Sequence, residues 1–275
     1  MPEPQTPGQP PILSHKDYAA PSLFLPENLL REARRQKGLP KGEVPETCIL
    51  DPDGDMVRSL AARGLAHRSR TWACYHTDLH VFTRSAAEYG VVGRAVGASF
   101  AVLVAEELFA SGCRLLISMT SAGQVRTTRK PPYFILIAKA LRDEGTSYHY
   151  LPPSAYAGMD GGLLARLEGA FSHLQVPVDR GATWTTDAPF RETAEAIERC
   201  RAEGILAVEM EAAALYAFAR ARSQPVICFA HVTNQMARVE GDFEKGEADG
   251  TEDALEVISA AARRWKSGTP QGNPS

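Results

Sequence analysis

The chain has 275 residues, of which 44% are hydrophobic and 23% charged, as is typical of a soluble globular protein with one large or two small domains. Its net charge of −3 gives no reason to expect nucleic acid or an anionic membrane as a partner. Charged or polar residues break every long apolar run, so no segment is expected to span a bilayer.

The N-terminal part of the chain, residues 1–46, is interpreted as a partly disordered extension. Residues 1–11 are rich in proline and lack the basic and apolar pattern of a secretory signal. A helix is predicted from Pro26 to about Lys37. The chain has five scattered cysteines, and this odd number suits reduced residues of a cytoplasmic protein. No Cys-x-x-Cys pair occurs, and we expect neither a metal nor an organic cofactor.

Strands and helices are predicted to alternate through residues 47–266, with a flexible tail at 267–275. The predicted strands are 47–50, a hairpin within 68–82, the start of 91–101, 113–119, 205–208 and 225–230. The predicted helices are 56–62, a helix ending at 110, 161–174, 192–202, 212–222 and 252–266. Residues 131–141 suit either a strand or a helix. This alternation predicts a single α/β domain with a central mixed β-sheet flanked by helices.

Two carboxylates interrupt an apolar run in residues 204–216. Glu209 and Glu211 stand where the predicted strand 205–208 gives way to the predicted helix 212–222. Open α/β sheets bind ligands at the carboxyl ends of their strands, and a buried unpaired carboxylate is costly. These two residues are therefore candidates for ligand binding. The alternative is that Glu211 is a first-turn acid favoured by the helix dipole and that Glu209 is salt-bridged.

The segment Val-Glu-Met-Glu-Ala-Ala-Ala at 208–214 closely resembles the sugar-binding signature of the nucleoside phosphorylase family. This family includes uridine phosphorylase, bacterial purine nucleoside phosphorylase and the methylthioadenosine nucleosidases. The resemblance extends over roughly residues 47–265 and implies that 47–266 form a nucleoside phosphorylase-like catalytic domain. It implies that Glu211 holds the ribose hydroxyls as a catalytic residue and that Met210 lies against the sugar. Glu209 and Thr120 complete the expected ribose-binding set.

Two further segments resemble the family's phosphate-binding elements. Gly54 and Arg58 match a Gly-Asp-x-x-Arg element whose arginine binds phosphate, and a glycine turn before a helix exposes free N–H groups. Residues 120–123, Thr-Ser-Ala-Gly, resemble the loop whose Thr binds phosphate and ribose. Many phosphorylases carry an arginine where this chain has Ile117. Either Arg94 supplies that charge, or phosphate is not the nucleophile. The expected phosphate-binding residues are Gly54, Arg58, Arg94, Thr120 and Ser121, with Arg58 and Arg94 also catalytic.

The resemblance also places the nucleobase. Trp184 occupies the position of an aromatic residue that stacks on the base in purine phosphorylases, and its face suits a flat ring. The alternative is a tryptophan that fills the core. Phe190 and Arg191 are expected to line the base edge. Asn234 stands where related enzymes use an Asp to protonate a purine, and an amide donates a hydrogen bond but no proton. This favours uracil or a 6-oxopurine.

The resemblance implies a nucleoside phosphorylase that uses phosphate to release the base, with uridine or another pyrimidine nucleoside favoured. A nucleoside hydrolase, suggested by Ile117 and residues 121–123, and an inactive nucleoside-binding homologue are the alternatives. Family members form dimers, trimers or hexamers with sites near subunit interfaces, so a homo-oligomer is expected. A neighbouring subunit often supplies an arginine and a histidine to the site. The candidates here are Arg68, Arg70, Arg84 and His15.

Overall fold

The computed structural model describes residues 10–14, 16–235, 245 and 250–267. The α-helices are α1 (Pro26–Lys37), α2 (Asp55–Ala62), α3 (Ala98–Ala110), α4 (Gly161–Arg166), α5 (Ala194–Ala202), α6 (Ala212–Arg222) and α7 (Thr251–Ser267). The strands are β1 (Thr47–Asp51), β2 (Ala66–Arg68), β3 (His80–Arg84), β4 (Ala87–Gly93), β5 (Leu115–Gln124), β6 (Tyr133–Asp143), β7 (Tyr156–Gly158), β8 (Val178–Thr186), β9 (Ala207–Glu209) and β10 (Val226–Asn234). Short 3₁₀ helices are η1 (Pro11–Leu13), η2 (Thr146–His149) and η3 (Pro189–Arg191).

The strands form one mixed ten-stranded sheet that partly closes on itself. Hydrogen bonds join β5, β10, β6, β8 and β9 in a closed circuit, and β1, β4, β3 and β2 extend from β5 in that order. β1 runs parallel to both β4 and β5, and β5 runs parallel to β10. The predicted α/β fold with a mixed sheet is confirmed.

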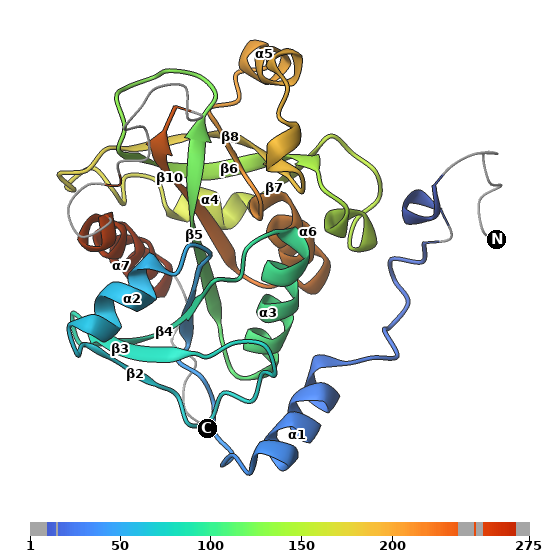
Figure 1. Ribbon diagram of the computed structural model, residues 1–275, viewed down its shortest axis with the longest axis vertical. Helices are drawn as coiled ribbons and strands as arrows, with labels where there is room; N and C mark the ends of the chain where they lie inside the picture. The colour runs from blue at the N-terminus through green and yellow to red at the C-terminus, as the bar shows by residue number, and fades with distance from the viewer. Residues whose placement is uncertain (1–9, 15, 236–244, 246–249, 268–275) are drawn as a thin grey trace.

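Helices cover both sides of the central strands: α2 and α7 lie on one side, and α3 and α6 on the other (Figure 1). Residues 212–218 of α6 are all buried, and four of these seven are alanine, so the helix packs closely on the sheet. Tyr216 fixes its position, because its hydroxyl donates to Ile137 O (2.5 Å) and accepts from Cys228 N (3.1 Å). No helix in the described ranges combines the length and apolar character needed to cross a membrane.

Several predicted elements differ in extent from the observed ones. Residues 131–141, which suited either strand or helix, form most of β6. The helix predicted for 161–174 ends at Arg166, and Gly169 then adopts a φ of +72° that ends regular helix. The predicted hairpin is present as β2 and β3, which pair antiparallel but are separated by the long stretch 69–79. His15 lies outside the described residues.

Candidate active site

Several of the predicted ligand-binding residues lie at or next to places where a strand ends and a helix begins, namely Gly54, Arg94, Glu209, Met210 and Glu211. Asp51 ends β1, and the turn that follows leads into α2. Gly93 ends β4 and Gly97 caps α3, while Glu209 ends β9 and Glu211 caps α6. Open α/β sheets bind ligands at such an edge, and the topology therefore gathers segments distant in sequence around one place.

Glu211 is buried and held in one orientation by the backbone and by Thr120. Its side chain accepts a hydrogen bond from Gly97 N at Oε1 (2.7 Å) and from Thr120 Oγ1 at Oε2 (2.9 Å). Met210 N approaches Oε2 at 3.3 Å. Burial, followed by the charge of Glu209, raises the pKa of Glu211 to about 7. Two carboxylate oxygens offer about four acceptor positions, so these three donors leave room for about one further hydroxyl donor.

Glu209 faces different partners and builds the frame around Glu211. Its Oε1 accepts from the hydroxyls of Thr183 (3.0 Å) and Thr185 (2.5 Å), and its Oε2 accepts from Glu211 N and Ala212 N (2.7 Å each). Burial raises its pKa, while these four donors act in the opposite direction. Glu209, rather than Glu211, therefore satisfies the first N–H groups of α6, and hydroxyls replace the salt bridge of the alternative interpretation. These contacts are structural, and a ribose contact for Glu209 stays a prediction.

Gly54 and Arg94 are brought together on the expected phosphate side. Gly54 caps α2 with a φ of +77°, and a Cβ built on it would lie 3.0 Å from Arg94 Cγ and 3.4 Å from Nε. Only glycine leaves this space for the arginine side chain. Arg94 itself has a φ of +66°, an uncommon conformation for a residue with a side chain, and its N–H donates to Asp51 O (3.0 Å). Arg58 is exposed, and its Nη2 lies 2.7 Å from Asp55 Oδ1.

Three aspartates and a lysine, none of them predicted as ligands, lie beside Thr120 and Ser121, which belong to β5 rather than to the loop expected from the sequence. Ser121 Oγ donates to Asp53 Oδ2. Lys245 Nζ lies 2.8 Å from the same Asp53 oxygen and 2.5 Å from Asp55 Oδ2. Burial raises the pKa of Asp51 to about 6. The Asp-Pro-Asp-Gly-Asp sequence at 51–55 was the available signal for these carboxylates, whereas no local signal pointed to Lys245.

Trp184 lies in a hydrophobic cluster. Its side chain is 3% exposed, and its Nε1 donates to Asp143 Oδ2 (2.9 Å). The cluster also contains Val125, Ala182, Ile197, Cys200, Ile205 and Val208. Its strand neighbours Thr183 and Thr185 point toward Glu209, and successive strand residues face opposite sides. These contacts favour the core interpretation, and the stacking of Trp184 on a base stays a prediction.

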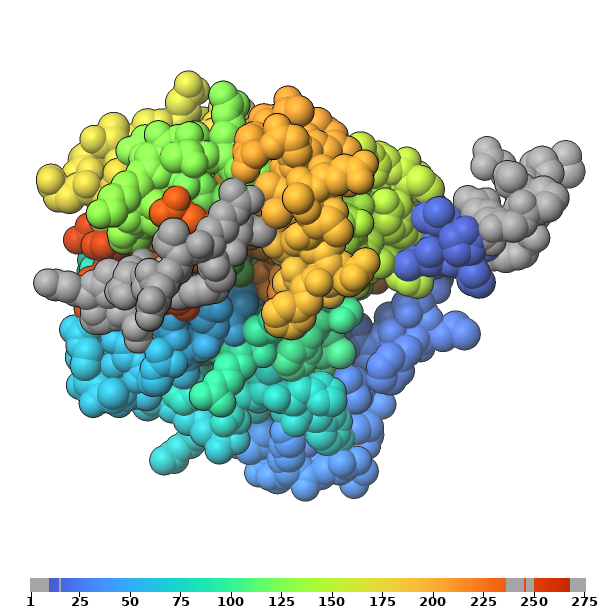
Figure 2. All heavy atoms as spheres, turned by 45° about the horizontal axis from the view of Figure 1, so that its top comes forward, coloured from blue at the N-terminus to red at the C-terminus, as the bar shows by residue number. Residues whose placement is uncertain are grey.

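The other predicted base-side residues occupy two different settings. Phe190 is 99% exposed, and Arg191 beside it is also exposed. They belong to the stretch from η3 to α5, which forms a ridge on the face shown in Figure 2. Asn234, by contrast, is buried at the end of β10, paired in register with Gly123 of β5. The sheet therefore brings Asn234 to the segment predicted to bind phosphate and ribose.

The three candidate arginines for a neighbouring subunit differ in their partners. Arg68 pairs with Asp78 (2.6 Å) and Arg84 with Glu252 (2.9 Å). Arg70 is exposed, and its guanidinium has no hydrogen-bond or ion-pair partner within the described part of the chain. Of the three, Arg70 is the one whose charge is not already paired.

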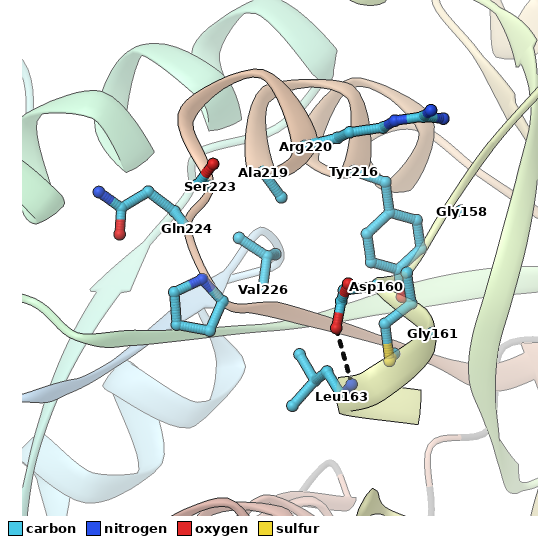
Figure 3. A pocket seen from close by; sticks show the side chains of 12 residues that line it. Gly158, Asp160, Gly161, Leu163, Tyr216, Ala219, Arg220, Ser223, Gln224 and Val226 are labelled. Atoms are coloured by element: carbon cyan, nitrogen blue, oxygen red, sulfur yellow. Dashed lines mark hydrogen bonds between the residues drawn. The ribbon is translucent and has the colours of Figure 1, made fainter. Parts of the chain in front are cut away.

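A cavity of about 670 Å³ lies elsewhere, at the amino end of β10 (Figure 3). It is bordered by Tyr216, Arg220, Val226, Asp160 and Leu163, and Asp160 Oδ1 accepts from Leu163 N (2.8 Å). Because β10 runs from Val226 here to Asn234 beside Gly123 of β5, this cavity is at the other end of the strand from the candidate site. Within the described ranges, no group of three or more His, Cys, Asp or Glu residues is arranged to hold a metal ion.

Comparison with known proteins bears on the family and the fold of the chain. The sequence profile of the phosphorylase superfamily matches residues 49–265. A guanosine phosphorylase from Halorubrum lacusprofundi is 26% identical over 184 residues, covering 66% of this chain and 74% of that protein. Uridine phosphorylase from Vibrio fischeri ES114, complexed with 6-hydroxy-1-naphthoic acid, superposes with a TM-score of 0.70 at 19% identity, covering 84% of this chain and 99% of the other. A second structure of that enzyme gives 0.67 at 21% identity, covering 81% and 93%. The structural matches show the fold.

Proposed function

Since the chain belongs to the phosphorylase superfamily, we propose that it is a nucleoside phosphorylase, which cleaves an N-glycosidic bond with phosphate to give a free base and ribose 1-phosphate. The observation that carries this proposal is the buried Glu211 carboxylate, fixed by Gly97 and Thr120 at the carboxyl edge of the sheet. A preorganised carboxylate of this kind suits a ribose hydroxyl. Its charge also stabilises the positive charge that develops on the sugar as the bond breaks.

The phosphate would approach from the side of Gly54, Arg94 and Thr120. Thr120 would connect the sugar-binding and phosphate-binding residues. Its hydroxyl contacts Glu211, and the next residue, Ser121, lies on the proposed phosphate side. Arg58, which lies on α2, would contribute its positive charge at longer range. Catalysis would then rest on positioning the phosphate near the anomeric carbon and on electrostatic stabilisation.

The base is proposed to be uracil or a 6-oxopurine. Asn234, at the end of β10, offers an amide that donates to a base oxygen or nitrogen without transferring a proton. The named relatives support this choice, because guanosine phosphorylase and uridine phosphorylase both act on nucleosides whose bases carry ring carbonyl groups. Phe190 and Arg191 would contact the base from the exposed ridge.

We propose that the enzyme acts as a cytoplasmic homo-oligomer whose subunits complete one another's sites. The five cysteines are all free and buried, which suits a reducing compartment. The unpaired Arg70 would be the residue that one subunit supplies to its neighbour.

Base release from uridine, thymidine, inosine, guanosine, adenosine and methylthioadenosine, with and without phosphate, tests the proposal. Release of uracil or a 6-oxopurine only in the presence of phosphate is the expected result. Release without phosphate would overturn phosphorolysis. Tight nucleoside binding with no release from any compound would indicate an inactive binding homologue.

A nucleoside hydrolase is the second candidate, and the group Asp51, Asp53 and Asp55 favours it. These carboxylates bring negative charge to the place expected for phosphate, and Ile117 brings no compensating cation. Asp51, with a pKa near 6, is suited to accept a proton from water. Phosphate dependence separates the two candidates.

A further inference from the structure

Asp53 presents a carboxylate to two donors that suit an inorganic anion. Ser121 Oγ and Lys245 Nζ both reach the same oxygen, Asp53 Oδ2, and the lysine distance is 2.8 Å. Hydroxyl and ammonium donors can also bind a phosphate oxygen, the ammonium through a charge-assisted hydrogen bond. Here a carboxylate oxygen of the chain itself accepts from both donors.

The space around these groups is small. The cavity between Asp53, Thr120, Ser121, His231 and Lys245 measures about 20 Å³, roughly enough for one water molecule. A phosphate ion therefore requires that one of the lining side chains move. Asp53 is the best suited to do so, because its side chain is 35% exposed and lies in the turn between β1 and α2.

Among the described residues that line this cavity, Lys245 carries the positive charge. Neither Arg58 nor Arg94 lines it. The Lys245 side chain is 20% exposed and also contacts Asp55 Oδ2 at 2.5 Å. Burial lowers the pKa of Lys245, but the bonds to Asp53 and Asp55 outweigh this and raise it, so the ammonium form persists at neutral pH. Asp55 would keep the lysine directed into the cavity after Asp53 has moved.

We propose that Asp53 competes with phosphate for Ser121 and Lys245, and that phosphate binds by displacing the Asp53 carboxylate. Lys245 then becomes a phosphate ligand and supplies the charge that the chain lacks at Ile117. This inference rests on the proposed phosphorylase function. In it, Asp53 sets the phosphate affinity, because every phosphate that binds must first break the contacts of Asp53 with Ser121 and Lys245.

The test measures the KM for phosphate at saturating nucleoside and the Kd of inorganic phosphate by calorimetry, on the full-length chain. Asp53→Ala is expected to lower both constants about tenfold, as loss of one competing charge-assisted contact would. Lys245→Met is expected to raise both about tenfold or more, and Lys245→Arg to stay within about threefold of the wild type.

Asp55→Asn is the matched control. It removes an equal charge that also contacts Lys245, but Asp55 does not bond Ser121 and pairs with Arg58 instead. Suppose that the two variants acted only by removing a negative charge that repels phosphate. In that case Asp53→Asn and Asp55→Asn would change phosphate affinity equally, and the inference would be overturned. Competition predicts a clearly larger gain for Asp53→Asn.

The failure of this inference and the failure of the proposed function give different results. Phosphate-dependent base release with an unchanged phosphate KM in Asp53→Ala overturns the inference and leaves the phosphorylase standing. A different result overturns both the inference and the proposed function. In it, base release does not depend on phosphate in the wild type or in Asp53→Ala, and calorimetry detects no phosphate binding.

Discussion

The hydroxyl of Thr120 donates a hydrogen bond to Glu211 Oε2 over 2.9 Å, joining residues that are 91 positions apart in the chain. Thr120 belongs to the segment expected to bind phosphate, and Glu211 is expected to bind the sugar. If both roles hold, this hydrogen bond would align the sugar with the phosphate, and a substitution at either residue is expected to change the binding of both substrates.

Glu211→Gln is expected to lower kcat/KM by about 30- to 1,000-fold, or 2–4 kcal/mol, because a neutral amide does not stabilise positive charge on the sugar. The amide retains the size of the side chain, so the melting temperature should stay close to that of the wild type. Steady-state kinetics with the best nucleoside of the panel, beside a thermal melt, provide both numbers. A wild-type kcat/KM in this variant would contradict the assignment.

Glu209→Ala is expected to act on stability. It leaves Thr183, Thr185 and two backbone N–H groups without the acceptor that they share, at a cost of about 3–5 kcal/mol in the free energy of unfolding. Urea denaturation followed by circular dichroism measures this loss. Glu209→Gln keeps an acceptor oxygen and should lose less. A fully stable Glu209→Ala protein with a raised nucleoside KM would instead support a direct ribose contact.

The pH dependence of activity is expected to follow Glu211. Its pKa is about 7, and the sugar needs the ionised form, so kcat/KM should fall about tenfold per unit once the pH is well below 7. Because Glu209 lies beside it, the measured value belongs to the pair. In Glu211→Gln, the remaining activity should lose this acid limb.

The contribution of Glu211 to stability should change with pH in the opposite direction to its contribution to activity. The folded-state pKa lies above the ordinary value of 4.5, so the folded state binds the proton more tightly than the unfolded state does. This contribution is fully present below about pH 4.5 and is lost as the pH rises through 7. The difference in unfolding free energy between wild type and Glu211→Gln should therefore shift against the wild type between pH 5 and pH 8. An unchanged difference would show that Glu211 is ionised throughout.

Arg70→Ala is expected to raise the phosphate KM about tenfold or more, since it removes a cation that no described residue pairs. Arg68→Ala and Arg84→Ala, which break surface ion pairs, should change it much less. Mixed oligomers of Arg70→Ala and Glu211→Gln subunits provide a sharper measurement. If Arg70 acts in a neighbour's site, the mixture recovers activity that neither variant has alone. No recovery would place Arg70 within its own subunit's site or outside the site altogether.

The sequence predicts those parts of the molecule whose structure depends on short, continuous segments of the chain. The helix at 212–222 and the change of structure at Glu209 to Glu211 lie within a few neighbouring residues, where apolar runs and alanine content decide the backbone. The sequence does not show which side of β8 Trp184 faces, because this strand is buried on both faces from residue 182 onward and no alternation of polarity distinguishes the two sides. Lys245 and Asp53 are 192 positions apart, and no local sequence pattern indicates that they pair.

The contact between Gly97 and Glu211 spans 114 positions, and neither partner is placed until the sheet between them has formed. The Thr120–Glu211, Ser121–Asp53 and Lys245–Asp53 contacts likewise span 91, 68 and 192 positions, so no short fragment of the chain is expected to hold a working site. Chains dominated by such contacts close large loops before gaining native interactions, and they fold slowly. During synthesis, the chain should therefore become able to bind a nucleoside in a single late step, after α6 has left the ribosome. A chain truncated before residue 211 should show none of it, however much of its sheet has formed.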